Sequence, residues 1–172
     1  MTRFLAFVVT LMLAGCGGGF RDSNVNLSSI AVFEPEKYAG LWYEVASFPT
    51  FFQSGCTNTT AEYQVLESGG LSVRNRCLKD GVPTVIDGSA VVSGPGRLTV
   101  RLDGVPVSAP YWVLWVDEGY RTAVVGVPSG RAGWILNRTP DIPPDRLAAA
   151  REVLKFNGYD LSGLETTRQV PQ

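Results

Sequence analysis

Short apolar runs separated by turn-forming residues make up most of this chain from residue 42 onward. The turn residues cluster at 68–70, 79–81, 93–96, 103–104, 117–119 and 128–130. Such regular spacing is typical of an antiparallel meander that closes into a sandwich or an up-and-down barrel. The sequence therefore predicts an all-β domain with strands at 42–49, 58–67, 70–78, 83–93, 97–103, 111–117, 120–127 and 132–138.

Two of the predicted strands alternate cleanly between apolar and polar residues. In residues 71–77 the odd positions carry the apolar set, and in residues 98–102 the even positions carry it. Since successive side chains of a strand point to opposite faces, the arginines between these positions face outward. The residues that share an inward face by this period of two are Val73, Asn75, Leu98, Val100, Leu102 and, in the last strand, Leu136.

One amphipathic helix is predicted after the strands, over residues 146–156. Prolines and acidic residues at 141–145 precede it, and Asn157 and Gly158 end it, as expected for helix termini. Its apolar stripe, Leu147, Ala150, Val153 and Leu154, suits packing against the outside of a barrel. A partner-binding surface is the alternative role for this helix.

The N-terminal residues resemble a bacterial lipoprotein signal. Arg3 precedes an apolar run over residues 4–14, which is too short to span a bilayer. Residues 13–16 (Leu-Ala-Gly-Cys) resemble the lipobox, which implies cleavage after residue 15 and a Cys16 that carries a diacylglycerol and an amide-linked acyl chain such as palmitate. An ordinary signal peptide with a free Cys16 is the alternative.

Three regions follow from this resemblance. Residues 1–15 are the signal peptide, 16–32 the lipidated N-terminus and tether, and 33–172 the folded domain. Small polar residues at 17–29 predict a flexible leash with a reach of about 20 Å. Gly17 stands where an aspartate retains lipoproteins at the inner membrane, so the resemblance implies the outer membrane, facing the periplasm.

Composition excludes several function classes. The chain has 172 residues, enough for one domain, and no histidine, which rules out Ser-His triads and histidine-ligated zinc. Its net charge of −1 offers no electrostatic footprint for nucleic acid. We expect no cofactor and no metal.

Three ordered motifs resemble those of the lipocalins. Residues 40–44 (Gly-Leu-Trp-Tyr-Glu) resemble the opening signature of the first strand, 117–120 the second conserved turn, and 134–140 the third motif. The resemblance implies an eight-stranded up-and-down barrel with one C-terminal helix outside. It also implies structural roles for Gly40, Trp42, Asp117 and Arg138, with the arginine stacked over the indole at the narrow end.

Residues 108–114 (Ser-Ala-Pro-Tyr-Trp-Val-Leu) and the late Pro143 and Pro144 resemble the branch of the family that holds apolipoprotein D and bacterial outer-membrane lipoproteins. Tyr63 and Trp134 match inward aromatic positions of that branch, so they join the residues found by alternation as candidate ligand contacts. All of them could equally be ordinary barrel filling. The implied function is binding of a fatty acid or lysophospholipid by a monomer or weak dimer; a filled barrel that serves envelope assembly is another reading.

Cys56 and Cys77 are the remaining cysteines. Cysteines of a periplasmic protein tend to pair, and this bridge requires Cys56 to curl back from the first long loop. The alternative is an enzyme that modifies a lipid or isoprenoid through a free Cys77 thiol or through the carboxylate of Glu44.

Overall fold

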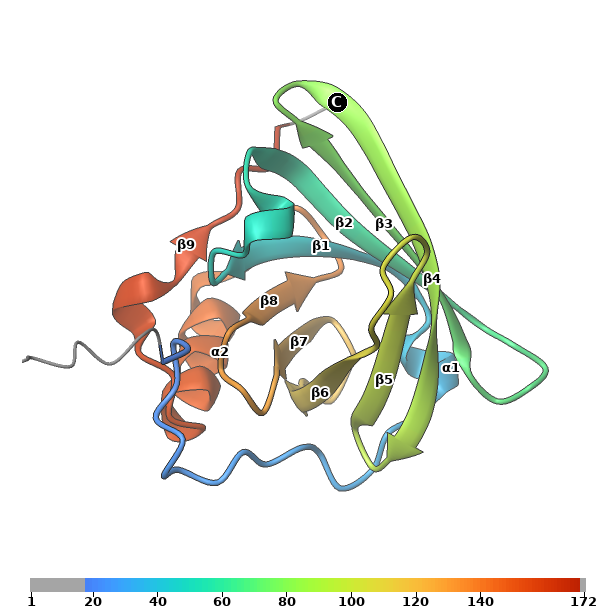
Figure 1. Cartoon of the computed structure of the whole chain (residues 1–172). Coiled ribbons are helices and arrows are strands. Elements are labelled where there is room, and N and C mark those ends of the chain that lie inside the picture. The colour runs from blue at the N-terminus through green and yellow to red at the C-terminus, as the bar shows by residue number, and fades with distance from the viewer. Residues whose placement is uncertain (1–17, 171–172) are drawn as a thin grey trace, which may run out of the picture.

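A computed structural model describes residues 18–170, in which eight antiparallel strands form a closed barrel (Figure 1). The strands are β1 Gly40–Ser47, β2 Cys56–Val65, β3 Leu71–Lys79, β4 Val82–Gly94, β5 Arg97–Leu102, β6 Ala109–Val116, β7 Thr122–Gly126 and β8 Gly133–Asn137. Each neighbour in the chain is a neighbour in the sheet, and β1 pairs with both β8 and β2. The prediction of an eight-stranded up-and-down barrel is confirmed.

The predicted helix packs on the outside of this barrel. It is α2, Pro144–Phe156, and its Ala150 and Leu154 are fully buried against the β-sheet side chains. Gly158 follows it with φ +85°, the left-handed conformation that glycine adopts without strain. The sequence thus located both the helix and its end. The structure adds short elements, among them α1 Pro35–Tyr38, η1 Phe51–Gln53 and η2 Leu161–Gly163.

The barrel separates two apolar cores. One fills the interior around Trp42, and the other lies between the outer surface of the sheet and α2, around Phe48 and Ile135. Because side chains alternate along each strand, the same strands supply both cores. A bulge between Glu44 and Ala46 of β1 keeps Glu44 on the inner face while Val45 and Ala46 join the outer core.

The C-terminal segment completes the barrel wall between β1 and β2. The β1–β2 ladder ends at the pair Tyr43–Thr60, and β9, Glu165–Thr166, pairs with β1 beyond that point. The amide of Gln169 then donates to the carbonyls of Glu44 (2.8 Å) and Thr59 (2.9 Å), one on each strand. No turn or periodicity signal in the sequence had marked this segment.

The N-terminal segment lies against the barrel, so the predicted flexible leash is wrong over residues 18–29. The Phe20 ring stacks on Phe48 at 4.9 Å, and the Ile30 amide donates to the carbonyl of Val113 at 2.9 Å. The composition suggested mobility because most residues are small and polar, but Phe20 and Leu27 pack against the outer core and Ile30 against the interior core. The predicted signal peptide and Cys16 lie outside the described residues.

No helix within residues 18–170 has the length and apolarity needed to cross a membrane.

Candidate functional site

The narrow end of the barrel is sealed by Trp42 and Arg138. The guanidinium carbon of Arg138 lies 3.8 Å from the indole centroid of Trp42, whose side chain has no exposed area. The same guanidinium donates to the carbonyls of Leu41 (2.9 Å), Lys37 (2.8 Å) and Ala39 (2.9 Å). Burial lowers the pKa of Arg138 from its usual value. The predicted cation–π stack is therefore present, and the N–H groups of Arg138 donate to backbone carbonyls.

Gly40 and Asp117 support this closed end. Gly40 has φ +96°, and a side chain at this position would come within 3.2 Å of the Arg138 guanidinium. Partial burial acts to raise the pKa of Asp117, but hydrogen bonds from the Thr122 backbone and from Arg121 outweigh it and lower the pKa. These contacts hold the β6–β7 turn. All four motif residues, Gly40, Trp42, Asp117 and Arg138, therefore make contacts that stabilise the closed end.

The strand register places all eight predicted ligand contacts on the inner face of the barrel. They form two groups that differ in exposure. Tyr63, Val73, Leu98 and Leu136 are buried in the interior core, whereas Asn75, Val100, Leu102 and Trp134 are only partly buried. The buried group lies toward the narrow end and the partly buried group toward the other end. The interior is therefore packed at the narrow end and accessible at the wide end.

Three tyrosine hydroxyl groups meet at the border between these two parts of the interior. The Tyr111 oxygen lies 2.7 Å from that of Tyr38 and 3.0 Å from that of Tyr63, which donates to it. Burial raises the pKa of Tyr63 to about 12 and the pKa values of Tyr38 and Tyr111 well above the usual range. All three groups thus remain protonated at neutral pH. We call them the tyrosine cluster.

The tyrosine cluster has more hydroxyl hydrogens than hydrogen bonds among its members. Three hydroxyls supply three hydrogens, and the two oxygen–oxygen contacts use two of them. Tyr38 is fully buried in the apolar core, while Tyr111 is partly exposed to the interior. Because an unsatisfied buried donor is costly, the remaining hydrogen is best placed on Tyr111. The cluster can therefore donate one hydrogen bond into the accessible part of the barrel.

A second polar network lies at the wide end, which we call the mouth. The indole nitrogen of Trp134 donates to the Gln53 side-chain oxygen (3.0 Å), and the Gln53 nitrogen donates to the Glu44 carboxylate (2.7 Å). Thr167 donates to the other Glu44 oxygen at 2.5 Å. These bonds fasten η1 and the C-terminal segment to the inner wall. Glu44 is only 5% exposed and is oriented on both oxygens by neutral donors.

An open groove of about 550 Å³ adjoins the mouth network. Its walls come from η1, the start of β2 and the C-terminal segment. Thr59 Oγ lies in this wall and is the one buried side-chain polar atom of residues 18–170 without a hydrogen-bond partner. The groove thus has a polar wall of its own beside the barrel mouth.

Several residues of the site were not found from the sequence. Tyr111 opens a predicted strand, so its inward position could have been read from the alternation of β6. Gln53 and Thr167 lie outside every predicted strand, and Tyr38 lies in α1. Their positions depend on loop conformations that no periodic pattern reports.

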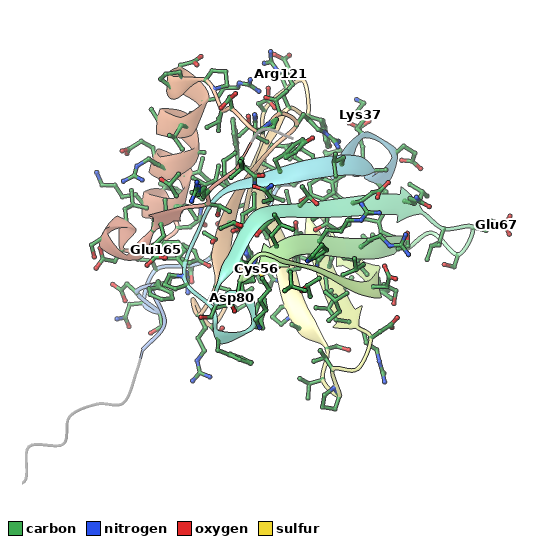
Figure 2. All side chains as sticks on the ribbon, turned by 90° about the horizontal axis from the view of Figure 1, so that it is seen from above. Lys37, Cys56, Glu67, Asp80, Arg121 and Glu165 are labelled. Atoms are coloured by element: carbon green, nitrogen blue, oxygen red, sulfur yellow. A yellow bond between two sulfur atoms is a disulfide. The ribbon has the colours of Figure 1, made fainter. Side chains whose placement is uncertain are left out.

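Cys56 and Cys77 form a disulfide, with their Cα atoms 5.5 Å apart. This confirms the predicted pairing, and a bonded sulfur has no thiolate, so Cys77 has no free thiol in this structure. Figure 2 shows Cys56 close to Asp80 of the β3–β4 turn and far from Glu67, so the bridge lies at the mouth. No group of three or more carboxylate or cysteine side chains in residues 18–170 could hold a metal ion.

Known proteins are similar to this chain in sequence. Residues 33–169 match the family described as Lipocalin-like domain. Mouse apolipoprotein D is 32% identical over 181 residues, covering 98% of this chain and 95% of that protein. The Vibrio cholerae protein named outer membrane lipoprotein Blc is 32% identical over 175 residues, covering 98% and 99%. Temperature-induced lipocalin-1 of Arabidopsis thaliana is 36% identical over 145 residues, covering 78% of each.

Solved structures show the same architecture at lower sequence identity. Insecticyanin from the tobacco hornworm Manduca sexta superposes with a TM-score of 0.69 at 21% identity, covering 84% of this chain and 85% of its own. Lobster apocrustacyanin A1 gives a TM-score of 0.67 at 18% identity, covering 79% of each chain. From the family match, these relatives and the closed barrel, the chain belongs to the lipocalin family.

Proposed function

We propose that this protein is an acylated lipocalin that holds a fatty acid or lysophospholipid inside its barrel. Cys16 would carry the acyl chains after removal of residues 1–15, and the barrel would face the periplasm from the outer membrane. The lipobox-like residues 13–16 support the anchor, as does similarity along nearly the whole chain to a protein named an outer membrane lipoprotein. Two or more acyl chains give durable anchoring without a membrane-spanning helix.

The observation that carries the ligand proposal is the position of the partly exposed Tyr111 hydroxyl, on a cluster with one hydrogen more than its internal contacts use, beside an apolar wall. Tyr111 can donate to a carboxylate or phosphate oxygen, while Val100, Leu102 and Trp134 offer apolar surface around it. Each methylene removed from water contributes about 0.8 kcal/mol, so several of them support micromolar affinity. An amphipathic lipid satisfies both features, whereas a purely polar ligand satisfies only the first.

Binding without chemical change is the simplest use of this interior. The disulfide removes the Cys77 thiol, and both Glu44 oxygens already accept hydrogen bonds that fasten the mouth. We therefore assign Glu44 to positioning η1 and not to acid–base chemistry. We further propose a monomer or weak dimer as the working form.

The test is a titration of the mature acylated protein, kept soluble by an amphipathic polymer, with oleate and with oleoyl-lysophosphatidylethanolamine. Saturable change in tryptophan fluorescence is expected, and Trp134→Phe should remove most of it because Trp134 lines the accessible wall. Mass spectrometry of lipid extracted from protein purified from its host identifies the natural ligand. Absence of both a saturable signal and a co-purifying lipid would contradict the proposal and favour a filled barrel.

A further inference from the structure

The N-terminal segment leaves the folded domain at the mouth. The amide of Phe20 donates to the carbonyl of Gly130 in the β7–β8 loop at 2.7 Å, and the Phe20 ring stacks on Phe48 just after β1. Both partners belong to connections at the mouth end of the barrel. In Figure 1 the blue segment crosses the outside of the barrel from α1 toward the start of β8. The chain therefore enters the domain beside the mouth and not beside the closed end.

Very little chain separates this point from Cys16. Three peptide steps lead from Cys16 to Gly19, and a fully extended chain spans at most about 3.6 Å per residue. The Cys16 Cα thus lies within about 11 Å of Gly19. From Phe20 onward, the segment expected from composition to be a flexible leash is held on the barrel.

The mouth also carries an unusual number of exposed apolar side chains. Phe51 is 91% exposed and Val107 is 68% exposed, on two different loops. We define the apolar rim as the large exposed apolar residues of η1, the β3–β4 hairpin tip and the β5–β6 loop: Phe51, Phe52, Val82, Val105 and Val107. At the closed end the exposed large apolar residues are Val32 (70%), Val65 (41%), Leu66 (39%) and Leu41 (38%), all aliphatic, whereas the rim includes two exposed phenylalanines.

Charge does not favour an electrostatic partner for this rim. The loops at the mouth carry Lys79, Asp80, Asp103 and Arg131, two positive and two negative side chains. The β1–β2 connection, residues 48–55, has no charged residue at all. An apolar contact is therefore better matched to this surface than a strongly charged one.

We infer that the mouth of the barrel rests on the phospholipid bilayer that holds the Cys16 acyl chains, with the apolar rim among the lipid head groups. The inference rests on the proposed acylation of Cys16. Anchoring the chain beside the β7–β8 loop, at the same end of the barrel as the rim, makes the rim–bilayer contact intramolecular, so a modest apolar area is enough to maintain it. A lipid can then pass between the bilayer and the barrel interior without crossing water.

The test uses the full acylated protein in vesicles of phosphatidylethanolamine and phosphatidylglycerol that contain a phospholipid with a photoreactive tail. After illumination, mass spectrometry maps the lipid adducts along the chain. Adducts are expected on the peptides of η1 and the β5–β6 loop and not on those of Glu67 or the β4–β5 turn. Because the mouth loops sum to zero charge, high salt should leave the pattern unchanged.

A pair of variants separates rim contact from general apolarity. Phe51→Ser combined with Phe52→Ser should lower adducts at the mouth by about tenfold, since two large apolar groups no longer enter the bilayer. The matched control is Val32→Ser, which removes a 70% exposed valine from the segment just before α1 at the closed end, away from the rim, and should leave the adducts unchanged.

The outcomes distinguish this inference from the proposed function. Adducts at the Glu67 end, equal labelling of both ends, or equal effects of the two variants would overturn the inference, and lipid titration of the same sample would still report ligand binding. An unmodified Cys16 peptide would overturn the anchor and the inference together. Labelling confined to the rim, with a Cys16 peptide of acylated mass, supports it.

Discussion

Each end of this barrel holds an inward-facing tryptophan, but the contacts that hold it differ between the two ends. At the closed end Trp42 is fully buried under the Arg138 guanidinium, whose donors reach several backbone carbonyls. At the mouth Trp134 remains partly exposed and donates to the neutral amide of Gln53, a loop residue. A delocalised charge with five fixed donors locks backbone segments together more firmly than one neutral amide does. Stability is therefore concentrated at the closed end, and access to the interior at the mouth.

The closed end is also more fully covered by other parts of the chain than the mouth is. The closed end is covered by α1 and the residues before it, and Phe33 and Tyr38 pack onto the interior core there. The mouth is bordered by loops whose apolar side chains, such as Phe51 and Val107, point into solvent. Buried apolar area thus decreases along the barrel axis, which leaves the wide end free to change shape when a ligand enters.

The largest expected effect comes from replacing the tryptophan of the closed end. Trp42→Ala should lower the free energy of unfolding by about 3–5 kcal/mol, because it leaves a cavity and removes the surface on which Arg138 stacks. The matched variant at the mouth, Trp134→Ala, should cost only about 1–2 kcal/mol, since its side chain is already partly exposed. Urea denaturation measures both. Equal losses would break the distinction between the two ends.

At the mouth, where fewer apolar side chains are buried, the Cys56–Cys77 disulfide is expected to add stability. Replacing Cys56 and Cys77 together by alanine should lower the free energy of unfolding by about 3 kcal/mol in the chain-entropy model, given the sequence separation of 21. The loss arises in the unfolded state, so the folded barrel should keep its circular dichroism spectrum. A denaturation midpoint unchanged from that of the parent protein would show that the bridge does not stabilise the mouth.

Alkaline pH should weaken the border between the two ends. Burial raises the pKa of Tyr63 to about 12, whereas an unfolded tyrosine ionises near 10. The fold thus stabilises neutral Tyr63. The resulting contribution to the free energy of unfolding is complete below pH 10 and is lost as pH rises toward 12. At about pH 11.5 it should amount to a loss of about 2 kcal/mol. Tyr63→Phe should show a shallower decline of unfolding free energy above pH 10; parallel declines would contradict this.

Much of the fold was predictable because its signals are local and repetitive. Turn residues marked all eight strands, and the period-two pattern placed residues such as Val73 and Leu102 on the correct face. The Trp42–Arg138 stack followed from motif resemblance, since the two residues are far apart in sequence and no local pattern joins them. The closed end is thus the part of the site that sequence reasoning described best.

The mouth was harder to predict because it depends on segments without periodicity. Gln53 reaches Trp134 only through the conformation of η1, and Thr167 reaches Glu44 only through the path of the C-terminal segment. The sequence predicted Phe20 to lie in a flexible leash, because its stacking partner Phe48 is apparent only in the folded barrel. Each error concerned a contact that a loop or terminus makes with an already assembled barrel.

The smallest expected effect comes from removing the Tyr111 hydroxyl, which can donate a hydrogen bond into the barrel interior. Tyr111→Phe should weaken oleate binding about fivefold to tenfold, the loss of one hydrogen bond of ordinary net strength, with little change in the shape of the interior. Tyr43→Phe is the control, because Tyr43 pairs with Thr60 and Asn137 on the outer face of the wall. A long-chain hydrocarbon without an acceptor should bind both variants equally. If Tyr111→Phe left oleate affinity unchanged, the ligand would be held at the mouth by apolar contact alone, and the tyrosine cluster would belong to the packed closed end.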